Sequence, residues 1–273
     1  MWTDADTAWM TRKALEPVLK TVDREALKGQ DVWLGVDLSQ VNDLTALAVA
    51  TKTGEKDGKP CYSVWVEYFT PGDTIRARSD RDGVPYDLWA REGHVNAVDG
   101  SRISFRDVAQ LIAELQNEYE IVSVAYDSYA FQRGLLPELQ ELGLDHLDLS
   151  EHPQGGTKKG KLTDAMKSAA EARGDENPSG LWMPRSVQHL EELIAEQRIT
   201  IDNNPANISC LMSASTMSDR WGNFWLSKDK SAQKIDGAVA MCMALGLAEV
   251  LDDGALGGGT LWDRDAAFSL TSL

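Results

Sequence analysis

The chain has 273 residues, which fits one large domain or one domain with appendages, and it can bury a substantial core without disulfide bonds. Its formal net charge of −16 argues against a passive nucleic-acid coat, because such proteins bind phosphates through an excess of Lys and Arg. The charge does not exclude a nuclease, since carboxylates that hold divalent cations are negative until the metal binds.

The cysteines predict neither a disulfide framework nor a zinc site. Cys61, Cys210 and Cys242 are odd in number and far apart, and they form no CxxC motif. No apolar run of about eighteen residues and no secretory leader is visible. We therefore expect a cytoplasmic protein without a membrane span.

The N-terminal part of the chain is predicted to be a helix followed by strands. Residues 3 to 28 have apolar side chains at helical spacing, and Gly29 ends this helix. Three strand candidates follow, at residues 32 to 37, 44 to 51 and 61 to 69. The turn-rich sequence TGEKDGKP separates the last two, which predicts an antiparallel meander. Residues 72 to 85 are predicted to be a loop.

Residues 104 to 143 predict a helix, a strand and a second helix. Ser104 is an N-cap candidate for a helix with one apolar face. The strand IVSVAY follows at residues 121 to 126 and leads into Asp127, and AFQRGLLPELQELG is predicted to be the next helix. Because such a unit adds a parallel strand to a sheet, we expect a mixed sheet.

The second half of the chain predicts short elements and one long helix. A loop rich in glycine and lysine at residues 153 to 161 precedes a helix from Leu162. Another helix is predicted at 186 to 196, and a further one near 205 to 213 between the short strands RITI and FWL. From Ile235, the sequence IDGAVAMCMALGLAEVL predicts a helix that is buried on most sides.

Three aspartates lie at the ends of these elements: Asp37 ends the first strand, Asp127 follows strand 121 to 126, and Asp236 opens the long helix. A single aspartate in such a place is more often a cap. If the two strands are neighbours and the helix packs across their ends, however, the three carboxylates converge. Burying them without a cation would cost several kcal/mol. Oxygen ligands favour Mg²⁺ or Mn²⁺, and two such ions support displacement at phosphorus.

Four motifs carry a resemblance to a known family over about residues 30 to 250. They are GVDLSQVNDLTALAV, YDLWAREGHV, IVSVAYDSYAF and KIDGAVAMCMALG. In this order they resemble the nuclease domain of tailed-bacteriophage terminase large subunits. The resemblance implies a ribonuclease H-like α/β fold, with a mixed central sheet flanked by helices. It also implies an endonuclease that cuts concatemers of double-stranded viral DNA during packaging, using two Mg²⁺ or Mn²⁺ ions. Asp37, Asp127 and Asp236 would be metal ligands, and Asp43 matches a further acid of some members.

The same resemblance implies an organisation and partners. The chain would comprise an N-terminal helical linker segment (1–29), the ribonuclease H-like nuclease domain (30–251) and a flexible C-terminal tail (252–273). Large terminases carry a packaging ATPase, but this chain has no GxxxxGK[ST] phosphate loop. The implied partners are double-stranded DNA, a packaging ATPase domain, the small terminase and the portal, in the host cytoplasm. The isolated domain is expected to be a monomer.

Two groups of lysines are candidates for contacts with DNA phosphates. They are Lys228, Lys230 and Lys234, just before Asp236, and Lys158, Lys159 and Lys161, in the loop at 153 to 161. A single lysine in a loop is more often only solvated, so the hypothesis rests on their occurrence in groups.

Three other functions stay open. A resolvase or integrase-like nuclease would share the fold and the chemistry. An actin-like or sugar-kinase ATPase also begins with a strand that reads GVDL, but AYDSYAF lacks the glycine that a second phosphate loop needs. A non-catalytic module of the packaging machine would use the three aspartates only as caps.

Overall fold

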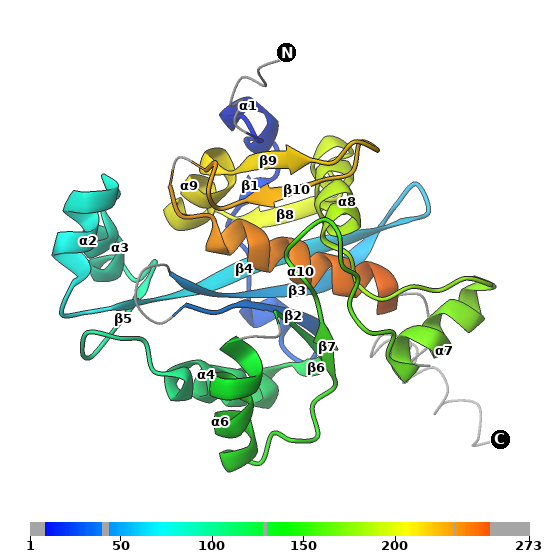
Figure 1. Ribbon diagram of the computed structural model, residues 1–273, viewed down its shortest axis with the longest axis horizontal. Coiled ribbons are helices and arrows are strands. Elements are labelled where there is room, and N and C mark those ends of the chain that lie inside the picture. Colours follow the sequence, from blue (N-terminus) through cyan, green and yellow to red (C-terminus); the bar gives the residue numbers. More distant parts are fainter. Residues whose placement is uncertain (1–8, 40–43, 128–129, 232, 252–273) are drawn as a thin grey trace.

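A mixed sheet runs through the centre of the molecule in the order β1-β8-β4-β3-β2-β6-β7, and β5 pairs with β4 beside this path (Figure 1). The strands are β1 (Leu19–Lys20), β2 (Asp31–Asp37), β3 (Thr45–Lys56), β4 (Lys59–Pro71), β5 (Asn96–Val98), β6 (Glu120–Tyr126), β7 (Leu149–Glu151) and β8 (Ile199–Asp202). The structure is a computed structural model, and it describes residues 9–39, 44–127, 130–231 and 233–251.

The pairing of the central strands confirms the predicted mixed sheet. β2, β3 and β4 form an antiparallel meander, while β6 lies parallel to β2, and β7 parallel to β6. In the parallel register Val36 is opposite Tyr126, and Tyr126 is opposite Glu151. The carboxyl ends of β2, β6 and β7 therefore meet at one edge of the sheet. This is the arrangement of the ribonuclease H-like fold.

Helices cover both faces of the sheet (Figure 1). One face packs against α4 (Phe105–Glu118), the π-helical turn η2 (Phe131–Leu135) and α6 (Leu136–Glu141). The other face packs against α10 (Asp236–Leu251), which lies between the sheet and α8 (Met183–Ala195) and α9 (Pro205–Ser213). Side chains alternate along β2, so Val32, Leu34 and Val36 lie in the core on the side of α4, η2 and α6. Gly35 faces α10 on the other side.

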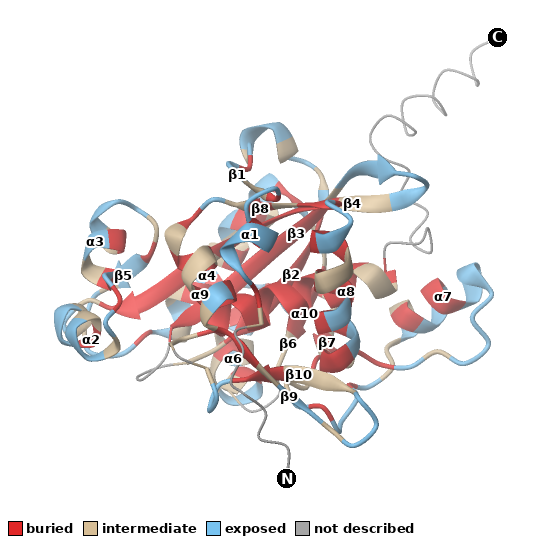
Figure 2. Cartoon of the chain, turned by 90° about the horizontal axis from the view of Figure 1, so that it is seen from above, coloured by how far each residue is buried: buried red, intermediate tan, exposed pale blue. Residues whose placement is uncertain are grey.

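Small residues allow α10 to lie very close to the sheet. A Cβ atom on Gly35 would be 2.3 Å from the carbonyl oxygen of Ala240 and 2.6 Å from the amide nitrogen of Ala244. A Cβ atom on Gly237 would be 1.9 Å from the hydroxyl oxygen of Tyr68. Figure 2 shows α10 and the central strands as buried, whereas the outer surfaces of α2 (Ile75–Asp82) and α7 (Asp164–Arg173) are exposed. The first turn of α10 is therefore fixed against β4, and the following turns against β2.

Three further elements surround this framework. The hairpin of β9 (Ser215–Ser218) and β10 (Phe224–Ser227) leads into the segment before α10. α7 (Asp164–Arg173) follows the loop at 153 to 161, and α3 (Tyr86–Arg91) precedes β5. Among the described residues, no helix has the length and apolar character needed to cross a membrane.

The predicted helix over residues 3 to 28 is wrong in the part that the structure describes. Residues 9–28 contain only α1 (Arg12–Leu15), β1 and the 3-10 turn η1 (Glu25–Leu27). β1 pairs in parallel with β8 at the edge of the sheet, and Leu15 and Val18 are buried in the α10 core. Apolar residues at helical spacing thus contact the core from a segment of short turns and a two-residue strand. The boundary at residue 29 stays a prediction, and the tail from residue 252 lies outside the described residues.

Part of the loop predicted at residues 72 to 85 is a helix, α2 (Ile75–Asp82). Its sequence IRARSDRD has no apolar stripe, so periodicity gave no helical signal. α2 packs against α3, buries Arg78 and ends at Gly83 in the left-handed conformation, with φ of 65°. Tertiary contacts, rather than local preference, explain this helix.

Candidate active site

The structure brings Asp37 and Asp236 together at the carboxyl edge of β2. Asp37 is the last residue of β2 and is 3% exposed, and Asp236 is the first residue of α10 and is 1% exposed. Lys228 Nζ donates to Asp37 Oδ2 at 2.8 Å and to Asp236 Oδ1 at 2.9 Å. One ammonium group therefore bridges two buried carboxylates, which we call the acid pair.

Gln154 completes the contacts of Asp37. Its Nε2 donates to Asp37 Oδ1 at 2.8 Å, so each carboxylate oxygen of Asp37 accepts a hydrogen bond from a side chain. Gln154 lies in the loop after β7, the strand next to β6. Sequence reasoning missed this residue, because its position depends on β7, which was too short to be predicted.

Asp127 lies next to the acid pair in the register of the sheet. Because Val36 is opposite Tyr126 in neighbouring parallel strands, Asp37 and Asp127 follow at the same level, with the two strands about 5 Å apart. Asp127 is half-buried. In the described residues, however, no group of three or more His, Cys, Asp or Glu side chains is close enough to hold a metal ion. Asp43 lies outside the described residues.

The acid pair determines the protonation of Lys228. Burial by itself would lower the pKa of this lysine, but the charges of Asp37 and Asp236 and their hydrogen bonds outweigh burial and raise the pKa well above its usual value. The side chain therefore stays protonated at any ordinary pH. It serves as a cation between two carboxylates that could not both be buried as anions without one.

Buried polar groups support the start of α10. Tyr68 donates from its hydroxyl to Asn207 Oδ1 at 2.8 Å, and Asn207 Nδ2 donates to the carbonyl oxygen of Asp202 at 2.9 Å. Burial, together with the nearby charge of Asp236, raises the pKa of the Cys210 thiol to about 12. Cys210 is therefore an unreactive buried thiol behind the acid pair, as its isolated position in the sequence suggests.

A cleft of about 270 Å³ opens beside the acid pair. Its lining includes Arg81, Asp82, Lys228, Gln233, Lys234 and Asp236. Arg81 pairs with Asp82, the last residue of α2, so the incorrectly predicted loop forms one wall of the cleft. Three basic side chains thus face a cavity that reaches a buried carboxylate, which suits a phosphate group.

The six candidate lysines occupy different places. Lys228 contacts the acid pair, Lys234 lines the cleft, and Lys230 is exposed on the same segment. Lys158, Lys159 and Lys161 are exposed in the loop at 153 to 161, where Lys159 Nζ lies 5.3 Å from the centre of the Trp182 ring. Contacts of these lysines with DNA stay a prediction.

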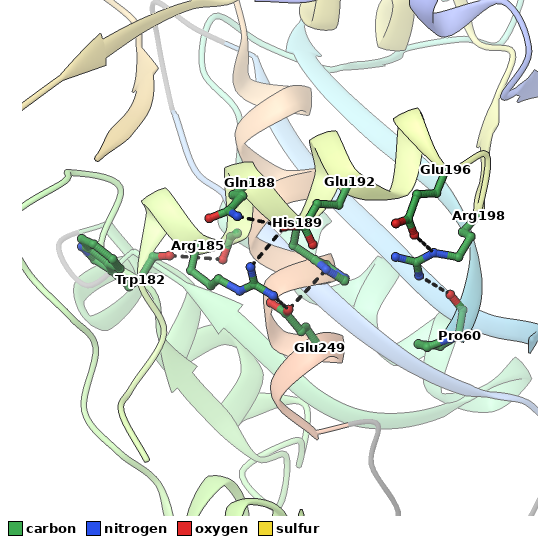
Figure 3. Close-up of polar contacts among 10 residues, drawn as sticks. Pro60, Trp182, Arg185, Gln188, His189, Glu192, Glu196, Arg198 and Glu249 are labelled. Atoms are coloured by element: carbon green, nitrogen blue, oxygen red, sulfur yellow. Dashed lines mark hydrogen bonds and ion pairs between the residues drawn. The ribbon is translucent and has the colours of Figure 1, made fainter. Parts of the chain in front are cut away.

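A second group of charged residues lies near the other end of α10 (Figure 3). Arg185 and His189 of α8 both contact Glu249 of α10, with His189 Nδ1 3.4 Å from Glu249 Oε1. Burial, and then the charges of Arg185 and Arg198, lower the pKa of His189 to about 3, so the ring is neutral at ordinary pH. Along the helix axis Glu249 is about 20 Å from Asp236. This group therefore joins α8 to α10 and is separate from the acid pair.

Comparison with known proteins identifies the family. The sequence model of the terminase large subunit, endonuclease domain, matches residues 1–177 and 178–251. The chain belongs to this family. The terminase large subunit of Enterobacteria phage HK97 is 31% identical over 224 residues, which is 81% of this chain and 38% of that protein. The crystal structure of the HK97 large terminase has a TM-score of 0.72 and 28% identity, covering 89% of this chain and 44% of that one.

A bacterial protein is also similar to this chain. Protein YmfN of Escherichia coli strain K12 is 24% identical over 261 residues, which is 93% of this chain and 50% of that protein. The chain thus spans half or less of the length of the curated relatives it matches. The resemblance expected from the four motifs is confirmed, as is the ribonuclease H-like fold.

Proposed function

We propose that the chain is a metal-dependent endonuclease that cuts concatemers of double-stranded viral DNA during genome packaging. Family membership supports a nuclease that acts with a packaging machine. The single observation that carries the proposal is the acid pair: two carboxylates, 3% and 1% exposed, held around one cation at the edge of the sheet.

The chemistry of the acid pair fits a divalent ion. The donors are carboxylate oxygens, which suit Mg²⁺ or Mn²⁺ better than zinc, and a positive charge already lies between two of them. We assign Asp37, Asp127 and Asp236 as the ligands, with Asp43 as a further one. When bound, two such ions would supply an activated water and stabilise the leaving 3′ oxygen.

The remaining side chains would position the acids and the DNA. Gln154 orients Asp37, while the contact between Tyr68 and Gly237 fixes the backbone that carries Asp236. Arg81 and Lys234 line the cleft and would hold the phosphate to be cut. Because the whole chain is strongly acidic, such local cations would have to guide the DNA to the site.

The proposed setting is the packaging motor in the host cytoplasm. The chain would work there with a packaging ATPase domain, the small terminase and the portal, and alone it would be a monomer. No base-reading element such as a recognition helix or a zinc finger was predicted, so we expect cleavage with little sequence preference.

Plasmid cleavage tests the proposal. Supercoiled DNA is incubated with the protein and Mg²⁺, Mn²⁺ or EDTA, and Asp127→Asn and Asp236→Asn are compared with Asp164→Asn, whose side chain is 97% exposed on α7. The first two variants should lose cleavage, because they lack metal ligands, while the control should keep it. Cutting confined to branched DNA would favour a resolvase-like enzyme instead. A wild-type protein that binds no Mn²⁺ and cuts nothing would favour a non-catalytic module, in which the aspartates are only caps.

A further inference from the structure

We propose that Lys228 is a built-in counter-ion of the acid pair, which the first divalent metal ion displaces into the adjacent cleft. The inference rests on the proposed function, since it assumes that Asp37 and Asp236 bind metal. It assigns Lys228 to the control of metal entry, a role different from that of a surface lysine that meets DNA.

The geometry makes the ammonium and the metal ion mutually exclusive. Lys228 Nζ is within 2.9 Å of one oxygen from each carboxylate, so it occupies the space between two oxygens that would hold the ion. Mg²⁺ binds its oxygen ligands at about 2.1 Å, so the same two oxygens would have to close around a smaller centre. A divalent ion placed there would also repel the ammonium strongly at such short range. Metal binding therefore requires that Lys228 leave.

The charges of the site favour this exchange. Lys228 brings one positive charge to the two buried carboxylates that it contacts, and Asp127 follows at the same level of the neighbouring strand. A divalent ion would be attracted to these carboxylates more strongly than a singly charged ammonium is.

The surroundings of Lys228 give it a route out. The side chain is 37% exposed, although its two partners are buried, and it lies just after β10 on the segment that leads to α10. Its unbranched stem has four rotatable bonds, so the ammonium can move without any shift of the backbone. The cleft of about 270 Å³ is lined by Lys228 itself, together with Arg81 and Lys234. The displaced ammonium would thus join two other cations where the phosphate is proposed to bind.

Metal binding to a matched pair of variants tests the first half of the inference. Calorimetric titration with Mn²⁺ at fixed pH compares the wild type, Lys228→Met and Lys230→Met, the last being an exposed lysine of the same segment. Lys228→Met should bind Mn²⁺ about tenfold more tightly, because the ion no longer has to displace a cation. It should also melt lower without metal and gain more than the wild type on adding Mn²⁺. Equal or weaker binding by Lys228→Met would overturn the inference.

Labelling of the unmutated protein tests the second half and does not depend on how a variant folds. An amine-acylating reagent is applied with and without saturating Mn²⁺, and modification at Lys228 is measured by mass spectrometry with Lys230 as the internal reference. The ratio of Lys228 to Lys230 should rise several-fold with Mn²⁺, because the ammonium leaves the acid pair. An unchanged ratio at saturation would show that Lys228 stays in place, and the inference would be wrong.

The two proposals fail in different ways. If neither the wild type nor Lys228→Met binds Mn²⁺, the metal-dependent function fails and the displacement fails with it. If Mn²⁺ binds and releases Lys228 but no DNA is cut, the displacement stands and the nuclease function fails.

Discussion

Replacing Gly35 by alanine should separate the two halves of the acid pair. The new Cβ atom would lie 2.3 Å from the Ala240 carbonyl oxygen and 2.6 Å from the Ala244 amide nitrogen, whereas real contacts of this kind are almost always beyond 3.0 Å. Both obstacles are backbone atoms of α10, so no side chain can rotate away. Helix α10 must move away from β2 by up to about 1 Å, and Asp236 moves with it.

The cost can be estimated from this geometry. Overpacking a dense core costs about 1 to 3 kcal/mol, and a clash with helix backbone belongs at the upper end. With a urea m-value of about 3 kcal/mol/M for a domain of this size, the denaturation midpoint should fall by about 1 M. Mn²⁺ affinity should fall too, because the ligands from β2 and α10 no longer fit one ion.

Urea denaturation followed by far-UV circular dichroism, together with calorimetric Mn²⁺ titration, measures both effects. Gly155→Ala is the matched control, because a Cβ atom there meets nothing within 4 Å and the backbone is not in the left-handed region. The free energy of unfolding of Gly155→Ala should differ from that of the wild type by no more than about 0.5 kcal/mol. If Gly35→Ala kept both the wild-type midpoint and the wild-type affinity, the close approach of α10 would not position the site.

Three further outcomes are expected. Burial lowers the pKa of His152 to about 4 and that of His189 to about 3, so the folded state excludes protons that the unfolded chain binds near pH 6.5. Stability should therefore be complete above about pH 6.5 and fall at lower pH, by up to about 1.4 kcal/mol per pH unit for each histidine down to its folded pKa. Urea midpoints at pH 7 and 5 measure this, and a flat profile would contradict it. Replacing Lys230 and Lys234 by alanine should weaken DNA binding and reduce its salt dependence by about one unit of slope per lost phosphate contact, as fluorescence anisotropy would show; an unchanged slope would place the DNA elsewhere. Gln154→Ala should weaken Mn²⁺ binding by about tenfold in calorimetry, since Asp37 loses the group that orients it, and unchanged affinity would remove Gln154 from the site.

The buried strands and the buried helix could be predicted from the sequence. These elements in turn predicted one part of the candidate site, the meeting of Asp37 and Asp236. The apolar runs at 32–37 and 121–126 correspond to β2 and β6, and the helix from Ile235 corresponds to α10. Each of these elements is buried on both sides or all round, which leaves a strong pattern in the sequence. Because their order restricts the topology, the convergence of Asp37 and Asp236 followed.

The missed features depend on contacts between distant parts of the chain. Lys228 and Asp37 are 191 residues apart, and Gln154 and Asp37 are 117 residues apart, so no local spacing indicates either pair. Three lysines precede Asp236, and only the path of the backbone after β10 decides which one reaches the acids. α2 and β1 were mispredicted for a related reason: their conformation is set by α3 and by β8, and not by their own sequences.

The order of the chain also bears on when the acid pair can form. The strand with Asp37 is made early, whereas α10 follows every strand of the described sheet in sequence. During synthesis the central strands would lack the helix that covers them, and long-range pairing of this kind is slow to form. Asp37 thus has neither Lys228 nor Asp236 beside it until nearly all of the described chain has emerged. A growing chain would therefore hold no complete acid pair before α10 packs, and the proposed nuclease activity would depend on that late contact.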